Sequence, residues 1–164
     1  MNQTLKGFTL IELIVVILLI SIVSVYAASR YIGTGSFSAY AAQEQAISII
    51  RQLQVYRIQS NTTNSYNPTF ELTASGGCLG SSVGCSAAAT PQAAQSRSDV
   101  MRLEGVSVSS TTSPVNFDLL GNPVTLNPDN TLLPLGSVTI TFTASGESAS
   151  VCINSQGYVS GGGC

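Results

Sequence analysis

The sequence from Phe8 to Ala28 reads FTLIELIVVILLISIVSVYAA, and this stretch decides the architecture of the chain. Within it, only Glu12 is charged at neutral pH. At a rise of about 1.5 Å per residue, a helix of this length matches the thickness of the hydrocarbon layer of a bilayer. The stretch therefore predicts a helix that can span a membrane, in which Glu12 is the group that needs an explanation.

Two simple interpretations leave Glu12 without a role. A secretory signal peptide would use Lys6 as its positive end and residues 25–27 as its cleavage site, but its apolar core is normally about 7 to 15 residues long. A plain membrane anchor fits the length, yet an ionised Glu12 at the centre of a bilayer costs roughly 2.5 to 3.5 kcal/mol. Both interpretations stay open as alternatives.

A third interpretation gives Glu12 a partner. Cleavage between Gly7 and Phe8 would create a cationic amine on Phe8, at the N-terminus of the apolar helix. If two chains pack side by side with an axial offset of about one helical turn, the amine of one chain meets Glu12 of its neighbour, and the two charges neutralise each other. Glu12 would then set the register of an assembly of such chains.

The residues around this position carry a family resemblance. The segment from Lys6 to Leu13, KGFTLIEL, resembles the leader-cleavage signature of type IV pilins and pseudopilins. The resemblance implies that a prepilin peptidase cuts after Gly7 and methylates the new N-terminal Phe8, and that Glu12 is the family's acidic residue. It covers the leader and the first helix, about a third of the chain.

Finer resemblances extend beyond the signature. The stretches SIVSVYAASRYIG (21–33) and AQEQAISIIRQLQ (42–54) are most similar to minor pilins of the mannose-sensitive haemagglutinin (MSHA) type. Residues 117–123, FDLLGNP, together with the final hairpin, loosely resemble minor pseudopilins of type II secretion. The implied partners are other pilins, major and minor, the prepilin peptidase and an inner-membrane assembly platform. The implied location is the inner membrane, followed by the pilus on the surface of a Gram-negative bacterium.

With the leader (1–7) that the resemblance implies, the pattern of residues predicts a helix over 8–60 and a head over 61–164. Residues 8–28 are the membrane span and filament core, and the rest of the helix is amphipathic. Its apolar stripe is Ile47, Ile50, Leu53 and Ile58, widened by Ile49, Val55 and Tyr56. The residues expected to face water are Gln43, Glu44, Gln45, Arg51, Gln52, Gln54, Arg57 and Gln59. Gly33 and Gly35 permit either a bend or close packing.

The head has the composition of a β-rich unit, because short alternating apolar runs are separated by Ser, Thr, Gly and Asn. In residues 137–143 the apolar side chains alternate with threonines, which predicts a strand with one buried face. A turn at 145–147 and a returning strand at 149–153 complete a hairpin. Weaker strands are expected at 69–73, 100–109, 115–117, 124–126 and 132–135. We expect an α+β pilin fold, with an antiparallel sheet packed against the second half of the helix.

The four cysteines, Cys78, Cys85, Cys152 and Cys164, all lie in the head. An even number of cysteines in an exported domain indicates disulfides. Of the three possible connectivities, we favour the local one, Cys78 with Cys85 and Cys152 with Cys164, because it closes the shortest loops. Neither spacing is Cys-x2-Cys, so we expect no zinc site.

Composition argues against several classes of function. The 164 residues include no His and carry a formal charge of -2, and the head alone has six carboxylates against two arginines. We therefore expect no His-dependent enzyme, no catalytic residues, no cofactor or metal, and no DNA binding. Asp118 is expected to stabilise a turn, and residues 161–163, GGG, to form a flexible tail. Residues 76–95 are expected to be loop.

These observations favour a structural function, that of a minor pilin of a type IV, MSHA-like pilus that contributes to assembly, attachment or retraction. Two alternatives stay open. One is a minor pseudopilin of a type II secretion system. The other, from a different class, is a secreted or membrane-anchored module that binds a carbohydrate or a protein through the Ser- and Thr-rich head.

Overall fold

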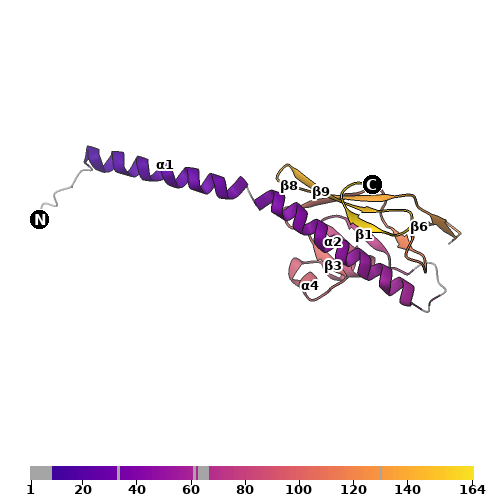
Figure 1. Cartoon of the computed structure of the whole chain (residues 1–164). Coiled ribbons are helices and arrows are strands. Elements are labelled where there is room, and N and C mark those ends of the chain that lie inside the picture. Colours follow the sequence, from indigo (N-terminus) through magenta and orange to yellow (C-terminus); the bar gives the residue numbers. More distant parts are fainter. Residues whose placement is uncertain (1–8, 33, 61, 63–66, 130) are drawn as a thin grey trace, which may run out of the picture. The chain divides into compact units, whose positions relative to one another are not determined.

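The computed structural model describes residues 9–32, 34–60, 62, 67–129 and 131–164 (Figure 1). The chain divides into two compact units, residues 1–34 and 35–164. The helical residues expected over 8–60 form α1 (Leu10–Ile32) and α2 (Thr34–Gln59). Gly33 lies outside the described residues. The predicted apolar helix is thus confirmed over the length of α1.

The second unit consists of α2 and a β-rich head. Figure 1 shows α2 running along the head beside β8 (Val138–Ala144) and β9 (Glu147–Ile153). The described strands form three antiparallel sheets, with the orders β1-β2-β3, β10-β9-β8-β4 and β5-β6-β7. Together with α2 they make an α+β architecture, which confirms the predicted fold class.

The four-stranded sheet contains the predicted hairpin. All seven residues of β8 pair with β9, from Val138 opposite Ile153 to Ala144 opposite Glu147. The connecting residues Ser145 and Gly146 both have positive φ, 51° and 87°, as a two-residue type I′ turn requires. The outer neighbours are β4 (Ser107–Ser110) and β10 (Val159–Gly161).

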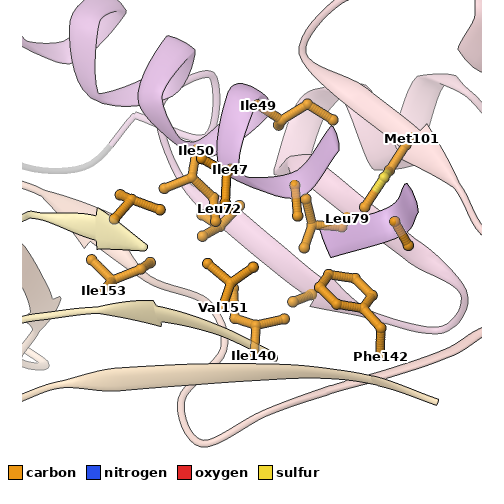
Figure 2. Packing of buried hydrophobic residues seen from close by; sticks show 14 of the residues in the cluster. Ile47, Ile49, Ile50, Leu72, Leu79, Met101, Ile140, Phe142, Val151 and Ile153 are labelled. Atoms are coloured by element: carbon orange, nitrogen blue, oxygen red, sulfur yellow. The ribbon is translucent and has the colours of Figure 1, made fainter. Parts of the chain in front are cut away.

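One face of α2 packs on this sheet and forms the main core. The buried side chains recur every three or four residues, so they lie on one side of the helix. On α2 they are Ala39, Ala42, Ala46, Ile47, Ile49, Ile50 and Leu53. Figure 2 shows Ile47 and Ile50 above Ile140, Val151 and Ile153 of the sheet, with Phe142 beside them. The alternating threonines of β8 point to the opposite face.

The stripe predicted for α2 is wrong toward its C-terminal end. Val55, Tyr56 and Ile58 are 46%, 42% and 48% exposed, whereas Gln54 and Arg57, expected to face water, are buried. Gln43, also expected to face water, is buried as well. The reason is that the head offers backbone carbonyls to these long polar side chains, which satisfy their hydrogen bonds.

The other two sheets hold shorter strands. One sheet contains β1 (Leu72–Ser75), β2 (Cys78–Ser81) and β3 (Val100–Arg102), and the other contains β5 (Asn116–Phe117), β6 (Pro123–Leu126) and β7 (Leu132–Pro134). The strand predicted over 100–109 is in fact two, β3 and β4, which belong to different sheets. Gly105, with φ +69°, lies in the turn that separates them.

The loop predicted over 76–95 is also wrong, because this segment contains β2, α3 (Ser82–Ala87) and α4 (Pro91–Gln95). The Ser81 hydroxyl caps α3 by accepting from Gly84 N at 2.8 Å, and Thr90 caps α4 by accepting from Ala93 N at 3.3 Å. Both helices are short, and their sequences, SVGCSA and PQAAQ, show no apolar period.

The C-terminal tail is ordered at its start, contrary to the prediction for 161–163. Gly161 belongs to β10 and pairs with Val151 of β9, and Gly162 N donates to Ser150 O at 2.7 Å. Asp118 stabilises a turn as predicted: its Oδ1 accepts from Leu120 N at 2.8 Å and from Asn122 N at 2.9 Å.

Candidate functional site

The surface of α1 is the most unusual feature of the chain. Along residues 10–27 no side chain is buried, and the large apolar ones are 39% to 77% exposed. Among the described residues, α1 is the one helix that is long and apolar enough to cross a membrane. An exposed apolar surface of this size must be covered by lipid or by other proteins.

The polar side chains within α1 are adapted to an apolar environment. The hydroxyl of Ser21 donates to Ile17 O and that of Ser24 donates to Ile20 O, each at 2.7 Å. Each hydroxyl therefore brings its own acceptor from the preceding turn, and neither needs water.

Thr9 and Glu12 form the start of the helix. Leu13 N donates to Thr9 O at 3.2 Å, and Glu12 N donates to the hydroxyl of Thr9 at 3.3 Å. Thr9 is therefore the N-cap, and Glu12 takes the third helical position, which is the spacing of a capping box. This role of Thr9 was not predicted from the sequence, although the Thr-x-x-Glu pattern indicates a helix N-cap.

The carboxylate of Glu12 is exposed and makes no hydrogen bond or ion pair with the described part of the chain. Its place in the first turn is favourable, because the N-terminus of a helix carries a partial positive charge. The amine expected to pair with it belongs to Phe8. Both Phe8 and Gly7 lie outside the described residues.

The comparisons with known proteins address this same segment. Residues 5–28 match the prokaryotic N-terminal methylation motif. This motif is the signal of type IV pilin and pseudopilin precursors, and it spans the positions of Gly7, Phe8 and Glu12. It implies processing by a prepilin peptidase and assembly with other pilins. No curated protein and no solved structure matches the chain.

The motif and the fold point the same way. An apolar N-terminal helix followed by antiparallel sheets is an arrangement consistent with a pilin fold. Together with the exposed surface of α1, the motif fits a membrane-anchored precursor that later enters a pilus.

Long polar side chains attach α2 to the head. Gln54 Nε2 donates to Gly121 O at 2.8 Å and to Gly157 O at 2.7 Å, and Arg57 Nε donates to Phe117 O at 3.0 Å. Gln43 donates to Ser150 O, and Arg51 donates to Val159 O at 2.9 Å. Residues 43, 47, 50, 54 and 57 follow a spacing of four and three, which is the signal that could have placed Gln43, Gln54 and Arg57 on the buried face.

Two disulfides cross-link segments of the head. Cys78 is bonded to Cys85, which joins β2 to α3, and Cys152 is bonded to Cys164, which joins β9 to the C-terminal residue. Cys152 is buried on the face of β9 opposite Val151 and Ile153. The chain contains no other cysteine.

An ionic network lies next to the first disulfide. Arg97 donates from Nε and a terminal nitrogen to the two carboxylate oxygens of Asp99, each at 2.9 Å, and the Ser81 hydroxyl donates to Asp99 as well. Partial burial acts to raise the pKa of Asp99, but the hydrogen bonds from Arg97 and Ser81 and the charge of Arg97 outweigh it and hold that pKa below its ordinary value. This network stabilises the corner between β2 and α3.

Proposed function

We propose that the chain is a structural subunit of a type IV pilus-like filament. The observation that carries the proposal is the match of residues 5–28 to the methylation motif, on a helix whose apolar surface is uncovered within the chain. The precursor would sit in the inner membrane by α1 and would be cut after Gly7. The mature chain, starting at N-methylated Phe8, would enter the filament together with other pilins.

In this proposal Glu12 sets the axial register between subunits. A carboxylate surrounded by apolar side chains is costly unless a cation neutralises it. The amine of Phe8 from an adjacent subunit is a suitable cation, because it lies about one turn from Glu12 along the helix axis. Ser21 and Ser24 add no comparable cost, because their hydrogen bonds are satisfied within α1.

Within the filament-forming proteins, we favour a minor pilin of the MSHA type, with a function in assembly, attachment or retraction. The support is the similarity of residues 21–33 and 42–54 to that type. The methylation motif is common to pilins and pseudopilins, so a piston subunit of type II secretion is the other member of the same class. Detection of the chain in sheared surface fibres of its host would favour the pilus, and its absence from them together with impaired secretion would favour the piston.

The mass of the mature N-terminus tests the proposal most directly. We expect a chain beginning at Phe8 with one added methyl group. A chain that keeps residues 1–7 while it polymerises, or one that begins at Ala28, contradicts the proposal. The second outcome would favour secretion.

The variant Glu12→Gln tests the register. Loss of one partner of a buried ion pair costs roughly 3 to 5 kcal/mol, so we expect incorporation into filaments to fall by more than about tenfold. Membrane insertion should be unchanged, because a neutral side chain enters a bilayer more easily. Glu44→Gln, on the exposed side of α2, is the matched control and should assemble normally. Normal incorporation of Glu12→Gln would remove the register argument.

A further inference from the structure

A hollow of about 400 Å³ lies on the head, beside the segment that connects β4 to β6. It is lined by Glu71 and Asn116, by residues 112–114, and by Thr125 and Leu126. Its volume is within the range of small-molecule binding sites. It involves neither α1 nor the methylation motif, so its occupant is independent of the proposed filament function.

The backbone places Glu71 and Asn116 opposite one another. Leu72 and Val115 exchange two hydrogen bonds, Leu72 N to Val115 O at 2.8 Å and Val115 N to Leu72 O at 2.9 Å. Both side chains are in the core, at 1% exposure. The neighbouring pair in an antiparallel bridge, here Glu71 and Asn116, is the closely spaced one, and it points to the opposite face.

Both polar side chains are buried, Glu71 at 7% and Asn116 at 6% exposure, yet their hydrogen-bonding capacity is largely unused. One carboxylate oxygen of Glu71 accepts from the Ser82 hydroxyl. In the described part of the chain, the other oxygen of Glu71 and the side-chain amide of Asn116 have no hydrogen-bond partner. Glu71 also forms no ion pair with a described residue, because the ion pair among these residues joins Arg97 to Asp99.

The unused atoms of Glu71 and Asn116 are not sealed inside the protein. Every fully buried side-chain nitrogen or oxygen among the described residues has a hydrogen-bond partner, so an atom without one must reach accessible space. Glu71 lines the hollow, and Asn116 lines both the hollow and a smaller space beside Arg57 and Phe117. The hydroxyls of Thr112 and Thr125 line it too, and they also make no hydrogen bond within the described residues. Water bonds these atoms when the hollow is empty, so a ligand that binds here must offer matching donors and acceptors to replace that water.

The mixture of donors and acceptors identifies the class of ligand. The Glu71 carboxylate only accepts, the Asn116 amide donates two protons and also accepts, and the threonine hydroxyls do either. A metal ion would use the oxygens alone and would leave the Asn116 amide protons unpaired. An ammonium group would leave them unpaired as well. Adjacent hydroxyl groups donate and accept together, so they match the set completely.

We propose that the hollow lined by Glu71 and Asn116 binds a neutral saccharide through two adjacent hydroxyl groups. One hydroxyl donates to the free carboxylate oxygen of Glu71, and the next accepts from the amide of Asn116. The hydroxyls of Thr112 and Thr125 form hydrogen bonds with the next hydroxyl groups of the sugar. The apolar surfaces of Pro114 and Leu126 contact the carbon-bound hydrogens of the sugar ring.

The test uses the full chain in a detergent with a phosphocholine headgroup, since sugar-based detergents would compete. The probes are the methyl glycosides of glucose, galactose and mannose, and N-acetylglucosamine, each titrated by saturation-transfer NMR, and calcium chloride titrated alone by calorimetry. We expect saturable binding of at least one glycoside. Glu71→Gln should weaken that binding by about tenfold or more, because a charged acceptor is replaced by a neutral amide.

Two further variants make the test specific. Thr125→Val keeps the shape of the side chain and removes its hydroxyl, so it should fold normally and weaken binding several-fold, and it decides the test if Glu71→Gln does not fold. Glu104→Gln changes an exposed carboxylate outside the hollow and should leave binding unchanged. The proposal is overturned if no probe sugar binds, if sugar binding survives both Glu71→Gln and Thr125→Val, or if calcium alone binds and loses affinity in Glu71→Gln.

Discussion

The helices α1 and α2 differ in how their apolar side chains are shielded from water. The side chains of α1 are apolar around its whole circumference, and none from residue 10 to residue 27 is buried. In α2 the buried apolar residues, from Ala39 to Leu53, lie on one side and are covered by the head. The apolar surface of α2 is therefore covered by its own chain, whereas that of α1 depends on lipid or on other subunits.

The polar residues of the two helices differ as well. In α1 the hydroxyls of Ser21 and Ser24 bond to the carbonyls of their own helix. In α2 the side chains of Gln54 and Arg57 bond to carbonyls of the head, more than 50 residues away in the sequence. The serine hydroxyls of α1 therefore need no partner on a neighbouring chain, whereas those bonds of α2 attach it to the head.

The largest effect on stability should come from a matched pair of core truncations. Ile50→Ala removes a fully buried side chain of α2, so we expect it to lower the free energy of unfolding of the head by about 2 to 5 kcal/mol. Ile17→Ala removes a side chain that is 53% exposed on α1 and should leave it unchanged. Chemical denaturation in detergent, followed by near-UV circular dichroism of the head, measures both. Equal losses in the two variants would show that α1 is packed in the isolated chain.

A smaller effect is expected from the hydrogen bonds that attach α2. Gln54→Leu keeps the size of the side chain but leaves the carbonyls of Gly121 and Gly157 without this donor, so stability should fall by about 1 to 3 kcal/mol. Gln59→Leu, at the exposed end of α2, is the control and should change stability by less than about 0.5 kcal/mol. If the two variants were equally stable, the attachment of α2 would rest on apolar packing alone.

The smallest effect concerns pH and distinguishes the head from α1. Because folding lowers the pKa of Asp99 from its ordinary value of 3.8, its ionised form stabilises the head above that pH. The stabilisation is lost as the pH falls from about 3.8 through the lower pKa of the folded chain. We expect the melting temperature of the head to depend less on pH in Asp99→Asn than in the parent chain over this range.

The control for this measurement is Glu147→Gln, which removes an exposed carboxylate from the start of β9. It should retain the full dependence on pH between the two pKa values of Asp99. The helical signal of α1 in detergent should not follow this titration in any of the three proteins. A flat melting temperature in the parent chain would contradict the assignment of a lowered pKa to Asp99.

The elements that sequence reasoning located well are those with a strong local period. The alternation of Val138, Ile140 and Phe142 with threonines predicts β8, and the turn residues after it predict the hairpin with β9. The strand β2 and the helices α3 and α4 could not be found in this way. These elements are too short to show a period, and they are held by caps such as that of Ser81 and by the bond between Cys78 and Cys85.

The candidate sites also differ in whether a local sequence signal reveals them. Glu12 stands out by itself, because a single carboxylate within a long apolar run is unusual whatever surrounds it. Glu71 and Asn116 carry no such signal, since one precedes a short strand and the other begins a strand of two residues 45 positions later. They are brought together by the bridge between Leu72 and Val115, which belongs to no run of regular pairing.

The amino-acid sequence is enough to show an apolar helix with one acid near its start, a methylation motif around that acid, and a β-rich part with four cysteines and many hydroxyl groups. These features are local, because apolar length, period and motif are properties of consecutive residues. Which polar side chains of α2 are buried, how residues 76–95 fold, and that Glu71 lies beside Asn116 at the edge of a hollow follow from the folded chain alone. Each of these depends on carbonyls and side chains that are distant in sequence and become neighbours only when the sheets form.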